Sequence, residues 1–500
     1  MRKLFLLLAI CVASIAFFGC SSSSGDSSDD PSPGTALWAR SVDASTATSV
    51  FNSTAIDSSG NVYAVGYVST KGDFSFGNGV TVTGSSDSNN AVIVKYDSSG
   101  KALWARTPTS GDGSSIFYDV AVASNGRIYV VGNIGDTSTY TFGTSVAATV
   151  PYSNTYAPVI VAYNASGTAL SCSTTSTGSA YGIFFSLALT DADTLYAVGK
   201  IYGSTTDYTF GNSYGTATAI GSYDSSYSAV VVKYSMTDGR AIWANSTSSG
   251  DDESDFFSAC VDDDGYVYCG GEINGEEEFD FGGSATATGL VSGSTPVLVK
   301  YGSGGSAIWA ATPISSGTTS SAFSSVAVDS SGYLYALTGI SYGSTTEFAT
   351  GVSASGGAGG SFCVVKYDDA GTAILAKAPA ATNSIGGSDL ALDSEGNIYV
   401  TGTLTGGGAC TLDGSITLPA CSASSNAFLA KLGPTGSVAW AAAPSVGPNN
   451  SHFDNLAIGA SGTVYAVGNM YGTSAYQFAD GVTVAGSYSW ANALIVQYKR

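Results

Sequence analysis

One unit, repeated seven times, fills most of this 500-residue chain and constrains its fold more than any other feature. Each unit is anchored by the tyrosine of a Tyr-x-x-Gly motif, with Thr338 replacing the glycine in the fifth unit. The anchors are Tyr63, Tyr129, Tyr196, Tyr268, Tyr335, Tyr399 and Tyr465. They are separated by 64 to 72 residues. Self-similarity at a nearly fixed period is the signature of a repeat architecture, in which neighbouring units pack against one another.

Three further columns recur at fixed places in the units. Phenylalanine precedes the tyrosine by twelve residues at Phe51, Phe117, Phe184, Phe256, Phe323 and Phe453, with Gly387 in unit six. Lysine recurs at Lys95, Lys233, Lys300, Lys366 and Lys431, and tryptophan at Trp38, Trp104, Trp243, Trp309 and Trp440. We interpret the phenylalanines as core between units and the tryptophans as apolar packing on an outer strand. We expect the lysine stems to cover apolar surface while the ammonium stays in water.

Each unit contains four strand-like segments that are rich in β-branched and aromatic residues and are separated by tight turns. The turns 57–60 and 97–100 both read Asp-Ser-Ser-Gly. Aspartate bonds to its own backbone in such a turn, and glycine adopts the left-handed conformation that closes it. The first strand should therefore pair with the second, and the third with the fourth. A further hairpin is expected at 74–82, between the second and third strands.

Seven units of four antiparallel strands predict an all-β protein, a seven-bladed β-propeller over residues 36–500. The chain ends on a third strand at 494–498, and its ordered part begins with a fourth strand at 36–40. The N-terminal strand should complete the last blade and close the ring, which removes free sheet edges. An open solenoid is the alternative, but it would leave both ends exposed and require caps.

The repeat also resembles a known family. Its consensus is A-x-D-x-x-G-N-x-Y-x-x-G followed by V-K-Y-D-x-x-G-x-x-x-W-A, and the first half is clearest at 55–63. This pattern is similar to the bacterial β-propeller repeat family of secreted proteins and lipoproteins, over about residues 36–498. The resemblance implies a propeller fold but no particular activity, and it assigns no functional residues.

The N-terminus indicates export. Arg2 and Lys3 precede an apolar run at 4–18, which has the length of a signal-peptide core and is short for a membrane-spanning helix. Gly19-Cys20 resembles the cleavage site of bacterial lipoproteins, which implies a signal peptide at 1–19 and lipidation of Cys20. We predict a flexible Ser/Asp/Gly/Pro tether at 20–35. The alternatives are an ordinary signal peptide and an uncleaved anchor. We therefore expect a protein attached by a lipid anchor to the bacterial cell envelope, at the outer membrane, on its periplasmic or surface face.

Charge excludes one class of partner. The chain has 38 acidic and 17 basic residues, a formal charge of −21. Nucleic-acid binding requires a basic patch, so we expect no nucleic-acid partner.

Strand direction places the two kinds of short turn on one face and the longer connections on the other. Variable loops over a rigid scaffold commonly carry function, so we expect ligands on this long-loop face.

Unit four concentrates acidic residues on the predicted long-loop face. One connection holds Asp251, Asp252, Glu253 and Asp255, and the other holds Glu276, Glu277, Glu278 and Asp280. Calcium takes six to eight oxygen ligands, so Asp251, Asp252, Asp255, Glu276, Glu277 and Glu278 form a candidate calcium site. A solvated acidic patch is the alternative.

Two cysteine pairs are candidates for disulfides in an oxidising compartment. Cys260 and Cys269 flank a hairpin turn in unit four, and Cys410 and Cys421 flank an insertion in unit six. Cys172 and Cys363 fall in different units and should be free.

No sequence motif indicates a catalytic site or a cofactor. G-x-S-x-G, H-E-x-x-H and P-loop motifs are all missing, and the single histidine, His452, has no evident partner in sequence. We expect a monomeric, non-enzymatic binding scaffold whose partner is an envelope protein or glycan. The alternative is a propeller enzyme, a lyase or hydrolase that uses carboxylates on the long-loop face, with calcium as its one conceivable cofactor.

Overall fold

The computed structural model describes residues 30–136, 138–151, 155–178, 181–190, 194–203, 207–222, 225–250, 252–317, 320–419, 424–459 and 462–500. All regular structure in these ranges is β-strand. These ranges contain no helix that is long and apolar enough to cross a membrane. The predicted signal peptide and Cys20 lie outside the described residues.

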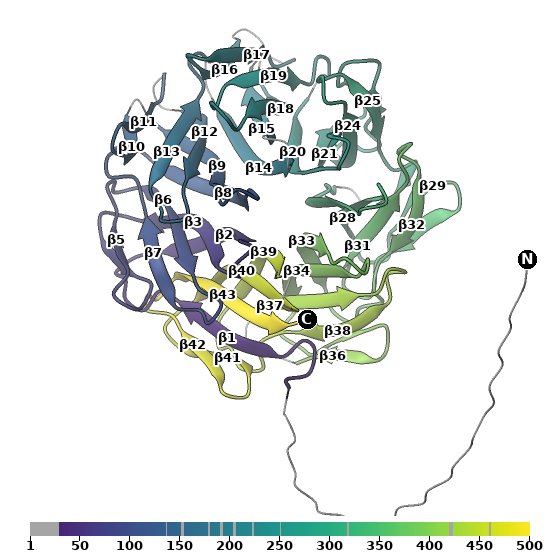
Figure 1. The fold of residues 1–500 in the computed structure, drawn as a ribbon. Coiled ribbons are helices and arrows are strands. Elements are labelled where there is room, and N and C mark those ends of the chain that lie inside the picture. The colour runs from purple at the N-terminus through teal and green to yellow at the C-terminus, as the bar shows by residue number, and fades with distance from the viewer. Residues whose placement is uncertain are drawn as a thin grey trace, which may run out of the picture.

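The strands form four-stranded antiparallel groups arranged around a central axis (Figure 1). The first strands are β2 (Ser49–Ile56), β8 (Ser115–Val122), β14 (Gly182–Thr190), β20 (Ser254–Val261), β27 (Ser325–Val328), β33 (Ile385–Leu392) and β39 (Ser451–Gly459). The second strands are β3 (Val62–Ser69), β9 (Ile128–Gly135), β15 (Thr194–Tyr202), β21 (Val267–Asn274), β28 (Leu334–Ile340), β34 (Ile398–Thr405) and β40 (Thr463–Tyr471).

The third strands are β6 (Asn89–Tyr96), β12 (Tyr156–Tyr163), β18 (Tyr227–Ser235), β24 (Ser294–Tyr301), β31 (Ser361–Tyr367), β37 (Ser425–Leu432) and β43 (Ala491–Lys499). The fourth strands are β7 (Ala102–Arg106), β13 (Ala169–Thr174), β19 (Ala241–Ser246), β25 (Ala307–Ala311), β32 (Ala373–Lys377) and β38 (Val438–Ala442), and β1 (Ala36–Ser41) pairs with β43. Such four-stranded antiparallel sheets are typical of propeller blades, so the all-β, propeller-type prediction is confirmed.

The first strands contact one another in chain order, and β39 contacts β2. The sheets of units five and six are joined by one parallel bridge, between Ser361 and Ile385. Apolar side chains fill the space between neighbouring sheets. The predicted role of the repeated phenylalanines is confirmed, since Phe51 is buried in one core cluster with Val467 and Ile495 of unit seven.

A short hairpin connects the second and third strands of every unit, as predicted for 74–82. The hairpins pair β4 (Asp73–Ser75) with β5 (Thr81–Thr83), β10 (Thr139–Gly143) with β11 (Val146–Thr149), β16 (Tyr208–Asn212) with β17 (Gly215–Ala219), β22 (Glu278–Asp280) with β23 (Thr286–Thr288), β29 (Thr345–Ala349) with β30 (Val352–Ser355), β35 (Cys410–Leu412) with β36 (Ile416–Leu418), and β41 (Ala475–Ala479) with β42 (Val482–Ala485). The two-residue β26 (Ser315–Ser316) joins β29. Bridges such as Ala44 to Ser75 tie these hairpins to the connections between units, so both lie on one face, as predicted.

A β-bulge explains the glycine of the Tyr-x-x-Gly motif. The pairing of β2 with β3 shifts between Phe51 and Ser53, which leaves Asn52 as the extra residue. The bulge drives the carbonyl of Val50 toward Gly66, where an added Cβ would lie 2.0 Å from that oxygen. Real side chains cannot be accommodated at that distance, so the motif requires glycine.

Unit five departs from this arrangement. Thr338 occupies the glycine position, and β27 has only four residues, beginning at Ser325. The amide of Phe323 bonds instead to the carbonyl of Gly271 in unit four. A side chain at the motif position is thus compatible with the fold only where the bulged half of the first strand is displaced.

Four tryptophans on fourth strands each join their own unit to the next. The ring of Trp104 lies against Gly167 in the turn between the third and fourth strands of unit two, where a Cβ would come within 2.8 Å of the ring. Its Nε1 donates a hydrogen bond to the carbonyl of Ala165 in the same turn. Trp38, Trp243 and Trp309 repeat both contacts with the following unit. The predicted packing role is confirmed, and it acts between units.

Lys95 corrects the prediction that the ammonium groups of the lysine column stay in water. Lys95 is only 6% exposed, and its Nζ lies 4.8 Å from the centroid of the Tyr63 ring and 3.4 Å from Oδ2 of Asp57. Asp57 accepts bonds from the amides of Ser59 and Asn61 and from the Tyr63 hydroxyl. Burial alone would raise the pKa of Asp57, but these bonds and the Lys95 charge hold it below its usual value. The ammonium is therefore withdrawn from water because a carboxylate and an aromatic face replace the lost hydration.

Substitution of the motif glycine tests the bulge. Gly66→Ala should lower the free energy of unfolding by about 2–3 kcal/mol, because the new methyl group overlaps the Val50 carbonyl. The matched control is Gly339→Ala in β28, where an added Cβ meets nothing within 4 Å. Urea denaturation compares the two midpoints. Equal midpoints for both variants would contradict the explanation.

Candidate functional site

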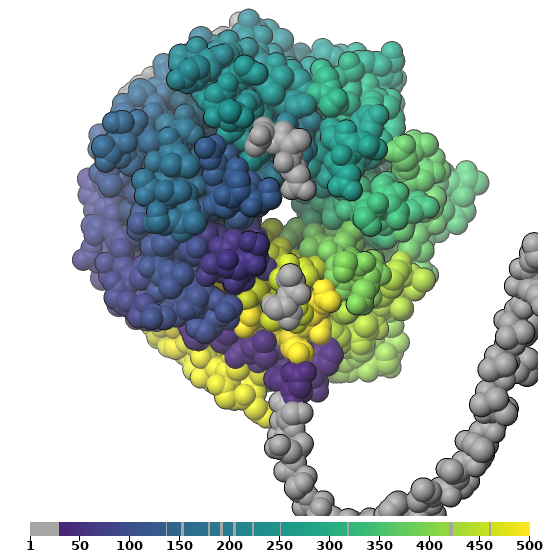
Figure 2. Space-filling view, in the orientation of Figure 1, coloured from purple at the N-terminus to yellow at the C-terminus, as the bar shows by residue number. Residues whose placement is uncertain are grey.

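The bulges aim one side chain per unit into a channel on the central axis, visible as the opening at the centre of Figure 2. The channel has a volume of about 240 Å³. The side chains at this level are Asn52, Tyr118, Phe185, Phe257, Ser324, Ser388 and Asp454. In six units this residue is the extra residue of the bulge, and in unit five it immediately precedes β27. Bulges commonly re-aim a side chain in this way beside a functional site.

The lining is divided into two different walls. Tyr118, Phe185 and Phe257 form an aromatic wall, with ring centroids 5.5 Å apart for Tyr118 and Phe185 and 5.8 Å for Phe185 and Phe257. The other units contribute small or polar side chains and one carboxylate, Asp454. The channel is therefore apolar along units two to four and acidic at unit seven.

A circuit of hydrogen bonds runs around the channel through the next residue of each first strand. Asp119 accepts bonds from the hydroxyls of Ser53 (2.6 Å) and Ser186 (2.9 Å) and from the amide of Leu187. On the opposite side, Asp389 accepts bonds from the Ser325 hydroxyl, the side-chain amide of Asn455 and the backbone amide of Leu456. Three further bonds complete the circuit: Ala259 N to Ser186, Val326 N to Ser258, and Thr54 N to Asn455.

Burial dominates the electrostatics of these carboxyl groups. It raises the pKa of Asp389 to about 6, although the bonds from Ser325 and Leu456 oppose the shift. It also raises the pKa of Asp119, against the bonds from Ser53 and Leu187. Burial raises the pKa of Asp454 to about 6. No described lysine, arginine or histidine forms an ion pair with Asp119, Asp389 or Asp454.

A group of aromatic residues continues the aromatic wall toward the long-loop face. We call Tyr156, Tyr181, Tyr202 and Tyr227 the tyrosine cluster. Ring centroids are separated by 5.4 Å for Tyr156 and Tyr181, 6.2 Å for Tyr181 and Tyr227, and 5.2 Å for Tyr202 and Tyr227. Lys200 connects the cluster to the channel, since its Nζ lies 4.1 Å from the Tyr227 ring and 5.8 Å from the Phe185 ring.

Lys200 also binds the acidic connection of unit four. Its Nζ is 3.0 Å from both Glu253 Oε1 and Asp255 Oδ2, and the other oxygen of Asp255 is buried without a partner among the described residues. Burial, with Glu253 nearby, raises the pKa of Asp255 against the opposing charge of Lys200. Burial and Glu253 also raise the pKa of Glu272. These groups form a compact charged site at the channel mouth.

The structure separates the residues predicted to bind calcium. A bridge from Ser249 to Asp280 brings the two acidic connections together, as expected. Asp255, however, turns inward to Lys200, whereas Asp252, Glu276, Glu277 and Glu278 are exposed. Asp251 lies outside the described residues. Within the described ranges no group of three or more His, Cys, Asp or Glu side chains could hold a metal ion, so the calcium site stays a prediction.

The predicted disulfide between Cys260 and Cys269 is wrong for this structure. Both thiols are free, because the register pairs Cys260 with Tyr268 and Cys269 with Ala259. Side chains alternate between the faces of a sheet, so this offset of one residue puts the two thiols on opposite faces. Cys172 and Cys363 are free, as expected. Cys410 is also a free thiol in this structure, and its predicted partner, Cys421, lies outside the described residues.

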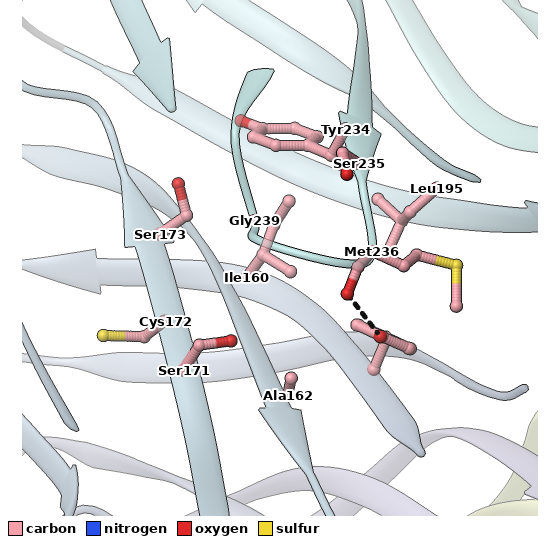
Figure 3. Close-up of a pocket in the computed structure, with 11 residues that line it drawn as sticks. Ile160, Ala162, Ser171, Cys172, Ser173, Leu195, Tyr234, Ser235, Met236 and Gly239 are labelled. Carbon is pink, nitrogen blue, oxygen red and sulfur yellow. Dashed lines mark hydrogen bonds between the residues drawn. The ribbon is translucent and has the colours of Figure 1, made fainter. Parts of the chain in front are cut away.

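A second cavity lies between units two and three, where the repeated tryptophan is replaced by Ser171 (Figure 3). Unit two also lacks the repeated lysine, since Ala162 faces Ser171 across the strand pair. The hydroxyl of Tyr129 bonds instead to the carbonyl of Met236. The remaining space, about 30 Å³, has room for about one water molecule, so it is a packing gap.

Sequence reasoning did not identify the channel residues. Asn52, Tyr118, Phe185 and Asp454 belong to a column with no shared chemistry, although each directly follows the repeated phenylalanine. The position directly after the repeated phenylalanine was the one sequence feature that could have identified these channel residues. His452, which has no evident partner in sequence, is half-buried in β39, with Nδ1 3.1 Å from the Thr403 hydroxyl.

Comparison with known proteins gives no family. No protein-family model matches the chain, and no curated protein matches its sequence. Solved structures of similar shape include the mitotic checkpoint complex (9% identity, 98% of this chain and 99% of that chain, TM-score 0.43). They also include the polysaccharide lyase Uly1 (10% identity, 90% of this chain and 89% of that chain, TM-score 0.41). A third is the Dos1 propeller (9% identity, 76% of this chain and 93% of that chain, TM-score 0.30).

The channel carboxyl groups should make stability depend on pH. The pKa of about 6 for Asp389 and Asp454 exceeds the value of about 4 in an unfolded chain, so the folded state binds protons more tightly. The stability that these two groups contribute should therefore fall as the pH rises from 4 through 6 and level off above that. We expect a higher urea midpoint at pH 5 than at pH 8.

The Asp454→Asn variant isolates the contribution of Asp454 to the dependence of stability on pH. It should raise the midpoint at pH 8 and leave the pH 5 value nearly unchanged, because the amide cannot ionise. Asp263→Asn, on an exposed turn, should preserve the wild-type slope. A wild-type midpoint that increases from pH 5 to pH 8 would contradict the interpretation.

Proposed function

We propose that the chain forms a closed seven-bladed propeller that acts as an exported, lipid-anchored binding scaffold. Closure is supported by the pairing of β1 with β43 and by the contact of β39 with β2. The hydrogen-bond circuit supports it as well, since it passes through the first strand of every unit. Such a ring provides a rigid support for the variable long-loop face.

The cellular location rests on the sequence at 1–20. If Cys20 is the lipidated residue, the full chain expressed in a bacterial host should incorporate radiolabelled palmitate and fractionate with membranes. Cys20→Ser should abolish both. Cys172→Ser, which changes a free thiol in unit two, should leave both unchanged. Labelling that persists in the Cys20 variant would overturn the proposal.

We propose that the ligand is an envelope glycan, bound at the channel mouth. The tyrosine cluster beside Lys200, Glu253 and Glu272 carries this proposal. The C–H face of a sugar ring packs on an aromatic face, and its hydroxyls exchange hydrogen bonds with phenol, carboxylate and ammonium groups. All three groups are present within one site.

Substitution within the tyrosine cluster tests glycan binding. Tyr181→Ala removes the ring that contacts both Tyr156 and Tyr227 and should weaken binding at least about tenfold, which corresponds to about 1.4 kcal/mol. The matched control is Tyr214→Ala, at an exposed hairpin tip (72% exposed), which should bind normally. Calorimetry against neutral, acidic and amino-sugar oligosaccharides gives the affinities. Equal affinities for both variants would refute the assignment.

The same samples distinguish a scaffold from the enzymatic alternative. A scaffold returns each oligosaccharide intact after prolonged incubation. A hydrolase would produce new reducing ends, and a lyase would also produce an unsaturated sugar that absorbs ultraviolet light. Either product would replace the scaffold proposal with the enzyme, and loss of the activity in Asp255→Asn would assign the carboxylate.

A further inference from the structure

The central channel combines an aromatic wall with an uncompensated carboxylate. Tyr118, Phe185 and Phe257 occupy one side, and Asp454 projects from unit seven at the same level. Asp454 makes no hydrogen bond or ion pair with a described residue, although the next residue, Asn455, and Asp389 of unit six are both engaged in the circuit. Its carboxylate is therefore directed into the channel without a partner.

The carboxyl groups in the channel wall favour the binding of a cation. Asp119 and Asp389 lie in the channel wall and accept hydrogen bonds from neutral donors only. Lys200 reaches the aromatic wall from the long-loop end, but Glu253 and Asp255 already pair with it. Electrostatic attraction is strengthened inside a channel with low-dielectric walls, so a ligand that brings positive charge is favoured there.

The form of the lining selects the kind of cation. No group of three described His, Cys, Asp or Glu side chains is arranged to hold a metal ion, which disfavours a coordinated metal. Aromatic faces attract organic ammonium groups through their quadrupole, and a carboxylate supplies the charged hydrogen bond. The volume of about 240 Å³ is below the roughly 300–1,000 Å³ of drug-sized pockets, which suits one functional group with a short alkyl stem.

We propose that the channel binds a primary alkylammonium group, with Asp454 accepting its hydrogen bonds and Tyr118, Phe185 and Phe257 packing around its stem. Two sources carry this chemistry, namely a small amine and a lysine side chain. The site uses other residues than the tyrosine cluster, so the proposal does not depend on glycan binding.

Calorimetry on the full chain with n-butylammonium chloride tests the site, with n-butanol as the neutral analogue and sodium chloride at equal ionic strength. We expect binding of the amine at one site per chain and none of the alcohol. Asp454→Asn should weaken binding at least about tenfold, and Phe185→Leu several-fold. Asp263→Asn, an exposed carboxylate on a turn, should bind as the wild type does.

Thermal melting without ligand shows whether each variant is folded, and Phe185→Leu gives an independent measure if Asp454→Asn is not. Unchanged affinity in both folded variants, or equal binding of n-butanol, would overturn the proposal. A comparison of n-butylammonium with the tripeptide Gly-Lys-Gly distinguishes the sources. Tighter binding of the tripeptide indicates a lysine side chain, and tighter binding of the free amine indicates a small-molecule ligand.

Discussion

The close approach between a bulged carbonyl and a glycine is the constraint on which the rest of the molecule depends. Where Val50 O points at Gly66, the first strand can bend, place Phe51 in the core and turn Asn52 toward the axis. The same contact recurs at Gly132, Gly199, Gly271, Gly402 and Gly468. Unit five, with Thr338, shows the consequence of its loss, since the first half of its first strand is displaced toward unit four.

Lateral contacts then convert similar sheets into one assembly. A row of Tyr63, Lys95 and Trp104 crosses the second, third and fourth strands of unit one, and the indole lies on a turn of the next unit. In unit two the lysine and the tryptophan are replaced together, by Ala162 and Ser171, and a small gap remains. Units five and seven change only one member of the row, since Lys366 pairs with Leu375 and Trp38 pairs with Gln497.

Repetition made the architecture predictable, whereas register limited the prediction of the site. Strand content, turn aspartates such as Asp57 and the sharing of one face by the long connections all follow from spacing. Register does not: the hairpin turn pairs Cys260 with Tyr268, and the bulge turns Asn52 into the channel. Burial of Lys95 was missed because its partners, Asp57 and Tyr63, come together only through pairing across three strands. Channel chemistry was missed because its column varies.

This variation has a consequence for how such a protein changes over time. The bulged residue has no partner in the strand pairing, so Asn52, Phe185 or Asp454 can be exchanged while the adjacent phenylalanine and glycine keep the strand in place. In each repeat, therefore, the residues that determine the fold and the residue that faces the ligand are neighbours but are different positions. A duplicated unit supplies a ready-made scaffold plus one freely editable position, and new ligand preferences around the axis can arise by single substitutions.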